Sequence, residues 1–287
     1  MRLWSVSVDL DGLGCYAAIH GLKLKLDDRA LRAVPEVALE RFCELFEDLR
    51  ISATFFAVGS EVQYGGDGLR RAASGGHEIG SHSFAHDYAM SRWDAARVAK
   101  DVEAAEEALA AAGVPKPRGF RAPGYSLSAA MLGVLRERGY AYDSSLLPSP
   151  PYMAAKACVL AWYALRGRRS ASILASAGLS RRGAHRRRGV RELPMATLPV
   201  VRVPAIGTSV LAAPWLARAA FAGGHFNFEL HGIDALDATD VPAEIAAVQP
   251  GVRTKAADKL ERLRAVLQAL PGEDVTLEQA AFRLIPA

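Results

Sequence analysis

Three histidines lie within one eleven-residue stretch of the chain, which runs from Gly76 to His86. Two of them, His82 and His86, are four positions apart. On a helical turn, side chains at that spacing lie on the same face, close enough to bind one ion. Neutral imidazole is the commonest protein ligand of zinc-like metals, so this pair is a candidate for two metal ligands. So short a pattern also fits a pair of surface histidines, and that alternative stays open.

Two aspartates at the end of the first expected strand could complete such a site. The alternating, valine-rich run from Trp4 to Leu10 predicts a strand, and Asp9 and Asp11 lie at its end. Residues i and i+2 of a strand point to the same side, so both carboxylates can face one site. One could bind a metal while the other takes up a proton. Because Gly12 follows Asp11, the alternative is an ordinary Asp-Gly turn.

Asp11, His82 and His86 together would form a set of two histidines and one carboxylate. Such a set leaves coordination positions open for water and substrate, which is typical of catalytic rather than structural metal sites. The three cysteines are far apart and form no C-x-x-C pair. They therefore predict neither a cysteine zinc site nor a disulfide framework.

The elements that must position these residues alternate between strand-like and helix-like segments along the 287 residues. Further strands are expected at 52–58, 119–121, 140–144 and 225–231, and helices at 34–49, 93–112, 128–138, 254–270 and 276–283. Ser91 and Ser126 are the expected N-caps of the second and third of these helices. No Pro/Gly/Ser-rich linker divides the chain, so we expect one α/β domain with a barrel-like parallel sheet.

Five motifs in this order resemble those of the polysaccharide deacetylase family, the group with the NodB-like homology domain, also called carbohydrate esterase family 4. The motifs are Asp9-x-Asp11, Ala53–Gly59, Gly76–His86, Arg121–Gly124 and Leu230-His231. The resemblance covers about residues 4–145 and returns near 226–234. It implies a distorted (β/α) barrel of the glycoside hydrolase/deacetylase type. We expect a single domain over residues 1–287, with a basic and apolar insertion at about 150–222.

The resemblance also implies a metal-dependent hydrolase that removes an N-acyl group, usually acetyl, from an amino sugar by cleaving a linear C–N amide bond. The implied cofactor is a divalent metal, with Zn²⁺ as the first candidate. By position, Asp9 is the general base, Arg121 matches the arginine that orients it, and His231 matches the general acid. The implied metal ligands are Asp11, His82 and His86.

Simple chemistry agrees with these roles, because amide hydrolysis needs an activated water, a base for its proton and an acid for the leaving amine. Arg121 beside Asp9 would keep that carboxylate ionised. The alternatives are a structural ion pair for Arg121 and an ordinary core or edge position for His231. We expect the backbone N–H of Tyr125 to face the oxyanion, as the family motif suggests. Asp143 would pair with Arg121 or His231, or merely end a strand.

Three further histidines are assigned less direct roles. His77 fits the family pattern at a position that is not a ligand, so we expect it to be part of the scaffold. We interpret His20 and His225 as ordinary polar residues.

One departure from the family concerns the two aspartates, which are usually adjacent but are separated here by Leu10. This spacing is similar to that of branches that act on atypical substrates, including cyclic amides and lipid-linked formamido sugars. The first hypothesis is therefore an N-deacylase of an amino sugar, which includes lipid-linked sugars and glycolipids. A hydrolase of a cyclic imide or other small amide is the alternative. A non-catalytic, membrane-associated binding protein is a third, although retention of the six site residues argues against it.

The net charge of +4 is a property of one segment rather than of the whole chain. Residues 152–188 hold nine Lys or Arg residues and no Asp or Glu, which leaves 26 basic against 31 acidic residues elsewhere. An apolar run at 153–165 precedes the cluster Arg166-Gly167-Arg168-Arg169, and a second apolar patch lies at 209–222. This pattern suits binding to an anionic membrane surface. The alternative is a pair of helices packed on the barrel, followed by a solvated basic loop.

No nucleic-acid partner is expected, because aromatic residues do not interleave with the basic ones. The N-terminal residues lack the apolar region of a signal peptide, and no apolar run reaches the ~18 residues that span a bilayer. We therefore expect a cytoplasmic protein that binds the inner face of the membrane peripherally. The sequence predicts no particular oligomeric state.

Overall fold

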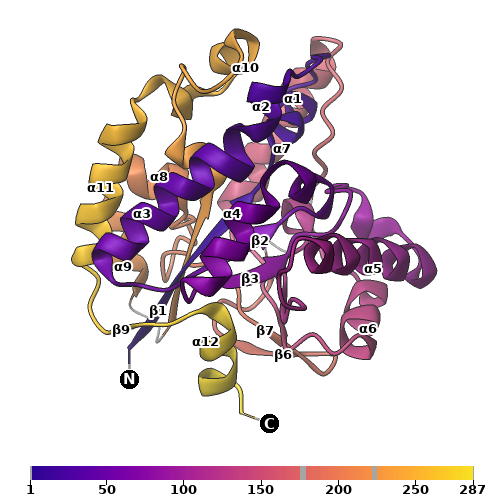
Figure 1. Cartoon of the computed structure of the whole chain (residues 1–287), viewed down its shortest axis with the longest axis vertical. Helices are drawn as coiled ribbons and strands as arrows, with labels where there is room; N and C mark the ends of the chain where they lie inside the picture. Colours follow the sequence, from indigo (N-terminus) through magenta and orange to yellow (C-terminus); the bar gives the residue numbers. More distant parts are fainter. Residues whose placement is uncertain (1, 175–178, 222–224, 287) are drawn as a thin grey trace.

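A mostly parallel sheet forms the centre of the computed structural model, which describes residues 2–174, 179–221 and 225–286 (Figure 1). The order of its strands is β6-β7-β5-β4-β3-β2-β1-β8, and β9 also pairs with β1. Their bounds are β1 Leu3–Leu10, β2 Ala53–Ala57, β3 Glu78–Ser81, β4 Gly119–Phe120, β5 Tyr142–Asp143, β6 His185–Arg187, β7 Val190–Glu192, β8 His225–His231 and β9 Glu273–Asp274. Among the described strands only β6 and β7 pair antiparallel. The two end strands, β6 and β8, do not pair with each other, so the sheet curls without closing.

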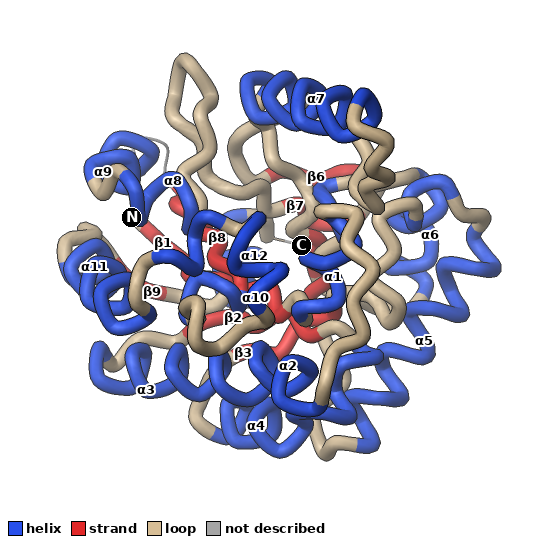
Figure 2. The backbone as a smooth tube through the Cα atoms, turned by 90° about the horizontal axis from the view of Figure 1, so that it is seen from above, coloured by secondary structure: helices blue, strands red, loops and turns tan. Residues whose placement is uncertain are grey.

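Helices surround this sheet on most sides when the molecule is seen from above (Figure 2). They are α1 Leu13–Ile19, α2 Asp28–Arg32, α3 Leu39–Leu49, α4 Val62–Ser74, α5 Ala95–Ala111, α6 Ala129–Glu137, α7 Pro150–Leu165, α8 Gly207–Ala212, α9 Trp215–Ala220, α10 Ala243–Val248, α11 Ala256–Gln268 and α12 Leu277–Leu284. The prediction of an α/β, barrel-like fold is confirmed. None of the described helices combines the length and the apolar character that a membrane-spanning segment requires.

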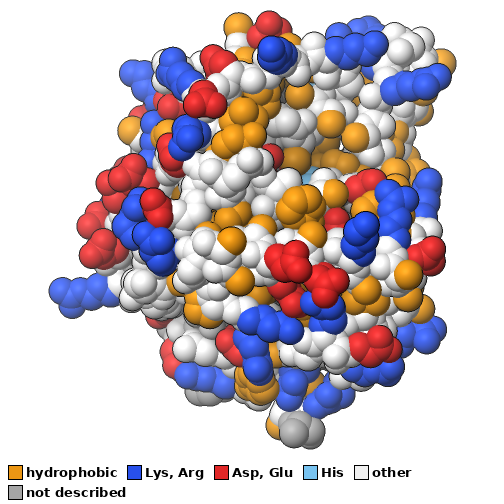
Figure 3. Space-filling view, turned by 45° about the vertical axis from the view of Figure 1, so that its right-hand side comes forward, with side chains coloured by type: hydrophobic (Ala, Val, Ile, Leu, Met, Phe, Trp, Pro, Cys, Tyr) orange, Lys and Arg blue, Asp and Glu red, His pale blue; other side chains and the backbone are white. Residues whose placement is uncertain are grey.

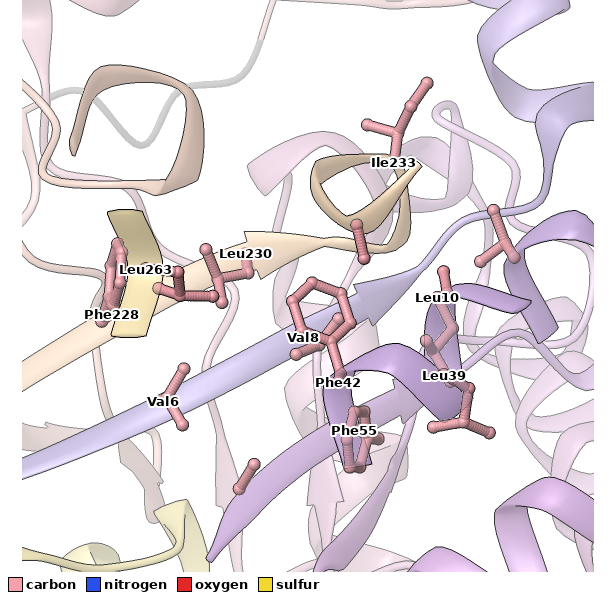
Figure 4. Close-up of a cluster of buried hydrophobic side chains, with 14 of the residues drawn as sticks. Val6, Val8, Leu10, Leu39, Phe42, Phe55, Phe228, Leu230, Ile233 and Leu263 are labelled. Carbon is pink, nitrogen blue, oxygen red and sulfur yellow. The ribbon is translucent and has the colours of Figure 1, made fainter. Parts of the chain in front are cut away.

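The alternation of β1 separates an apolar face from a polar one. Val6, Val8 and Leu10 belong to the apolar core, where Val8 lies beside Phe42 and Leu10 beside Leu39 (Figure 4). Ser5, Ser7 and Asp9 occupy the other face and are buried as well. Because successive side chains of a strand point to opposite sides, one strand both anchors the core and carries polar groups into the barrel interior.

Several boundaries differ from the sequence-based expectation. The second long helix begins later than expected, because Asp94 rather than Ser91 accepts the N-cap hydrogen bond, from the backbone N–H of Arg97. In the same way Ser128, rather than Ser126, caps α6. The helix expected at 34–49 is divided into a π-helical segment, Ala33–Ala38, and α3. These differences reflect local hydrogen-bond geometry, which spacing alone does not specify.

The apolar run at 153–165 forms most of α7, which begins at Pro150 with Ser149 as its N-cap. Its exposed side chains include Val159, Trp162 and Leu165. Tyr163 is buried, and its hydroxyl group shares a hydrogen bond with the ring of His20, with 2.7 Å between the hydroxyl oxygen and Nδ1. The helix therefore packs on the body of the protein along one side and leaves its other side exposed.

Two acidic side chains, Asp143 of β5 and Glu192 of β7, are fully buried opposite each other. Burial, reinforced by the neighbouring Asp143 carboxylate, raises the pKa of Glu192 well above its ordinary value. The folded protein therefore keeps a proton on Glu192 that the unfolded chain releases near pH 4.3. The stability that this proton contributes is complete below that pH and is lost as the pH rises.

We expect Glu192→Gln, which cannot ionise, to flatten this pH dependence. Each pH unit above about 4.3 costs the wild type up to about 1.4 kcal/mol of unfolding free energy, until the folded-state pKa is reached. Thermal unfolding between pH 4 and 8 measures the difference, with the exposed Glu107→Gln as control. A wild-type–variant difference that is the same at every pH contradicts the assignment.

Candidate active site

The ends of neighbouring strands bring the candidate residues to one edge of the sheet. Asp9 lies in register with His231 of β8, so the two side chains emerge next to each other. His82 directly follows β3, and Arg121 directly follows β4. Asp11 follows β1 by one residue. In parallel α/β folds, functional residues gather at the carboxyl ends of the strands, and this chain follows the rule.

The structure brings Asp11, His82 and His86 together, with candidate ligand atoms that all lie within 4.8 Å of one another. Asp11 Oδ1 is 3.2 Å from His82 Nε2 and 3.1 Å from His86 Nε2. All three side chains are buried. Asp11 Oδ1 and His86 Nε2 nevertheless have no hydrogen-bond partner among the described residues. Orphaned buried acceptors of this chemistry fit a divalent cation, which prefers imidazole nitrogen and carboxylate oxygen.

The two histidines do not converge on a helical turn, so that expectation was wrong. They lie in the loop after β3, where Ser83 and His86 have positive φ values of 64° and 48°. The Ser83 hydroxyl accepts a hydrogen bond from the His86 backbone N–H at 3.0 Å. The backbone N–H groups of Phe84 and Ala85 donate to the two carboxylate oxygens of Asp101, at 2.8 and 3.0 Å. A side chain from α5 thus fixes the loop that presents His86.

The orientation of His82 is set by its second ring nitrogen. Nδ1 lies 2.7 Å from the carbonyl oxygen of Arg121, which can only accept a hydrogen bond. Nδ1 therefore carries the proton, and Nε2 is left to face Asp11. A backbone carbonyl behind a metal-binding histidine is a common way to fix its tautomer.

The charges of the three groups depend strongly on one another. Burial alone would raise the pKa of Asp11, but the positive charges of His86 and His82 lower it well below its ordinary value. Burial would lower the pKa of His86, but the Asp11 carboxylate raises it to about 10. The site thus attracts positive charge to one buried carboxylate, and a divalent cation can replace the protons of both imidazoles.

Arg121 is fully buried, and its guanidinium donates hydrogen bonds to polar groups in the interior of the barrel. Its guanidinium donates to Asp9 Oδ1 at 2.6 Å and to Ser7 Oγ at 2.9 Å. It also donates to the hydroxyl and carbonyl oxygens of Ser144, at 3.0 and 2.9 Å. The second carboxylate oxygen of Asp9 lies 3.7 Å from His82 Nε2. Asp9 is thereby held by one oxygen and directs the other toward the cluster of Asp11, His82 and His86.

Glu229 is a site residue that the sequence reasoning missed. It lies on the same side of β8 as His231 and is fully buried. The Tyr125 hydroxyl donates to Glu229 Oε2 at 3.0 Å, while Glu229 Oε1 lies 3.8 Å from Arg121. Burial and the negative charge of Asp9 raise the pKa of Glu229 to about 7. The signal was the strict alternation of β8, which places Glu229 and His231 two residues apart on one face.

His231 is electrostatically prepared to hold a proton at neutral pH. Burial would lower its pKa, but the neighbouring Glu229 carboxylate, with Asp11 and Asp9, raises it to about 9. Its backbone N–H donates to Asp234 Oδ2 at 2.9 Å, which fixes the end of β8. A histidine in this state can donate a proton to a basic group.

The remaining sequence candidates occupy different positions. Tyr125 belongs to the turn Pro123–Tyr125 and reaches the site through its hydroxyl. Gly124 precedes it at φ 66°, and a Cβ there would lie 2.6 Å from the ring of Tyr88, so glycine is required. Among the described residues Asp143 forms no direct hydrogen bond or ion pair with Arg121 or His231, and its position fits the alternative of a residue that ends a strand. Asp143 instead accepts hydrogen bonds from the hydroxyl and backbone N–H of Ser145, at 2.6 and 3.1 Å, because its strand directs it there.

The three histidines that were assigned less direct roles lie outside the cluster. His77 accepts a hydrogen bond from the backbone N–H of Ala53 and packs against Phe55, as expected of a scaffold residue. His225 shares a hydrogen bond with Ser5 at the opposite end of β8. His20 is hydrogen-bonded to Tyr163 and Gln249 at the rim of the site.

A cleft of about 340 Å³ leads to these residues. Asp9, Asp11, His82 and His231 line it, and α7 contributes one wall. The space-filling view shows a hollow in the upper half of the molecule that is bordered largely by hydrophobic side chains (Figure 3). A polar reaction centre with a mostly apolar approach is the usual character of a small-molecule site.

Comparisons of the sequence with a family model and with curated proteins both find similarity to deacetylases. Residues 24–142 match the polysaccharide deacetylase family model. The peptidoglycan deacetylase of Helicobacter pylori is 27% identical over 150 residues, which are 50% of each protein. An uncharacterized protein of Bacillus subtilis is 28% identical over 100 residues, 35% of this chain and 31% of its own length. The chain thus spans half or less of the length of these curated relatives.

Solved structures agree in fold. A crystal structure described as a polysaccharide deacetylase from Mycobacterium smegmatis superimposes with a TM-score of 0.63 at 17% identity, covering 98% of this chain and 89% of that one. A carbohydrate esterase family 4 pseudoenzyme from Bacillus anthracis gives a TM-score of 0.50 at 10% identity, covering 98% and 65%. The resemblance seen in the motifs is confirmed: residues 24–142 match the family model, and the chain is similar to polysaccharide deacetylases in sequence and in fold.

Proposed function

We propose that the protein is a metal-dependent hydrolase that removes an N-acyl group, acetyl in the first place, from an amino sugar. The main support for this function is the cluster of Asp11, His82 and His86. It lies beside Asp9, which Arg121 holds in place. A structural metal site needs no such neighbouring carboxylate and no cleft leading to it. The metal dependence, the substrate class and the role of each residue are parts of this proposal.

Asp11, His82 and His86 would hold the divalent ion, with Zn²⁺ as the first candidate. When bound there, the ion supplies Lewis acidity, which polarises an amide carbonyl and acidifies water. Asp9, aligned by the guanidinium of Arg121, accepts the proton of the attacking water. His231 donates a proton to the departing amine, which leaves as a neutral group.

The protonation of His231 predicts a pH profile. Its pKa of about 9 keeps it in the acid form at neutral pH, so activity falls as the pH rises past that value. Glu229→Gln removes the main charge that raises this pKa, and we therefore expect the alkaline limb of kcat/KM to move to lower pH. Rates of acyl release across the pH range measure the shift. The exposed Glu107→Gln on α5 is the control, and an alkaline limb that moves equally in both variants contradicts this role of Glu229.

A glycolipid or lipid-linked sugar is the favoured substrate within this class. The wall of the cleft contributed by α7 includes Tyr152, Ala155, Val159 and Leu160. Open polysaccharide chains present mainly hydroxyl groups and gain little from such a wall, whereas a lipid chain gains apolar burial. The exposed Val159, Trp162 and Leu165 continue this surface to the outside of α7. Peripheral binding to an anionic membrane from the cytoplasmic side is therefore part of the proposal.

Acyl release tests the function directly, measured on N-acetyl-sugar oligomers, glycolipid extracts and cyclic imides with the metal-loaded protein. We expect release from the amino-sugar substrates and a loss of about 10²–10⁴-fold in Asp9→Asn, with the metal retained. Release from cyclic imides alone would support the alternative substrate class instead. No release from any of the three, with metal bound, would mean a non-catalytic binding protein. Co-sedimentation with anionic vesicles tests membrane binding separately, and protein that stays in the supernatant contradicts it.

A further inference from the structure

The α7 wall of the cleft contains one charged residue. The sequence of α7 is otherwise apolar or neutral, and Lys156 lies near its middle. Lys156 lines the same cleft as Asp9, Asp11, His82 and His231. It is half-buried rather than fully extended into water. Lysine usually extends its ammonium group to the solvent, so a lysine that turns into an apolar cleft needs an explanation.

Lys156 has no ion pair and no side-chain hydrogen bond among the residues that the structure describes. The carboxylates of the cleft are already engaged elsewhere, since Asp9 is bound by Arg121 and Asp11 lies between His82 and His86. Burial lowers the pKa of Lys156 to about 8, and no neighbouring acid counteracts it. A partly desolvated cation without a partner costs free energy in the protein alone, and a bound anion can recover that cost.

The surroundings of Lys156 indicate what kind of molecule would bring the anion. Ala155, Val159 and Leu160 flank it on α7, and Ile19 at the end of α1 lines the same cleft. The basic residues that follow α7 do not line the cleft; Arg166, for example, is exposed and stacks over Trp162 at 4.2 Å. The positive charge inside the cleft is therefore separate from the basic loop outside it.

We propose that Lys156 binds an anionic group of the substrate, a phosphate or a carboxylate, while the adjacent apolar wall contacts the part of the molecule next to it. This inference rests on the proposed function, because it adds a charged group to the same substrate whose acyl group reaches Asp11, His82 and His86. It narrows the substrate class to N-acyl amino sugars that carry a negative charge. Lys156 is then a specificity-determining residue of the cleft.

Calorimetric binding to the metal-loaded full chain tests the proposal without requiring turnover. The probes are N-acetylglucosamine 1-phosphate, N-acetylmuramic acid and dodecyl phosphate, which separate a sugar phosphate, a carboxylate and a lipid phosphate. N-acetylglucosamine is the uncharged reference. We expect at least one anionic probe to bind about tenfold more tightly than this reference, as a charge-assisted hydrogen bond in a partly desolvated site provides.

Lys156→Met keeps most of the side-chain volume and should abolish this preference, whereas Lys156→Arg should retain part of it. Arg166→Met removes the same charge from the outer end of α7 and should leave the preference unchanged. His82→Ala shows whether the anion binds at the metal instead. The inference is overturned if the wild type shows no preference for any anionic probe up to millimolar concentration. It is also overturned if the preference survives in Lys156→Met or disappears only in His82→Ala.

The outcome is independent of the test of function. A Lys156-dependent preference for anions without any acyl release would refute the hydrolase and leave an anion-binding cleft. Acyl release without that preference would refute only the role of Lys156. Thermal unfolding of Lys156→Met, expected at or above the wild-type temperature because the variant removes an unpartnered cation from a half-buried position, separates loss of the site from loss of the fold.

Discussion

His86→Ala should lose the bound metal and lower acyl release by at least about a thousandfold, which corresponds to about 4 kcal/mol of transition-state stabilisation. The imidazole lies 3.1 Å from Asp11 and is buried, so no surface group can take its place. Asp11 and His82 alone form an incomplete ligand set, which binds a divalent ion far more weakly. The metal content after dialysis, measured by mass spectrometry, and the rate of acyl release should fall together.

His185→Ala provides the matched control, because this histidine lies on β6, where its Nδ1 shares a hydrogen bond with the carbonyl oxygen of Gly183. It should keep both the metal and the activity. Stoichiometric metal in a dialysed protein that lacks both His82 and His86 would refute the assignment of the ligands. Loss of activity with full metal content would instead place His86 in the reaction itself rather than in metal binding.

Arg121→Met should lower the free energy of unfolding by about 3–5 kcal/mol, the usual cost of leaving one member of a buried ion pair without its partner. Arg121 is fully buried, and its guanidinium holds Asp9 at 2.6 Å. The variant removes the guanidinium donor of the Asp9 carboxylate and of the Ser7 hydroxyl, and one of the two donors of the Ser144 hydroxyl, which still accepts from Asn227 Nδ2. Denaturant unfolding measures the change, and activity should fall as well because Asp9 is no longer aligned.

A double-mutant cycle separates this interaction from general damage to the core. Adding Asp9→Asn to Arg121→Met removes the unpaired charge and should recover part of the lost stability. Arg283→Met breaks an exposed pair with Glu273 and should cost no more than about 1 kcal/mol. If the double variant is as unstable as the sum of the two single variants, Asp9 and Arg121 do not interact as proposed.

The sequence could predict that Asp9 and Asp11 face one side at a strand end, because alternation is a local property, whereas the place of His231 in the same site was expected only from the family resemblance. The spacing of Asp9 and Asp11 on an alternating strand indicated that both face one site, and the register of β1 with β8 adds His231 beside Asp9. The way in which the two histidines meet could not be predicted, because it depends on the backbone conformation of a loop. His82 and His86 meet through positive φ values at Ser83 and His86, which the spacing of two histidines does not reveal.

Glu229 and Lys156 were missed for a different reason. A glutamate within a strand and a single lysine within an apolar helix are both ordinary in sequence. Their importance lies in burial without a full set of partners, which only the packing of distant segments creates. The apolar run of α7 shows the same limit, since composition alone does not reveal which side of the helix faces a cleft.

Asp101 has a consequence for how the site meets an ion. Its carboxylate already satisfies the backbone N–H groups of Phe84 and Ala85, so the loop is ordered by folding itself rather than by the arriving ligand. The entropy cost of ordering the loop is therefore part of folding and does not weaken metal binding. In a loop that became ordered only when the metal bound, the same cost would lower the metal affinity. A protein that shares every ligand but lacks an acidic side chain at this point of α5 should be a weaker chelator. Comparing relatives by their ligands alone would overlook that difference.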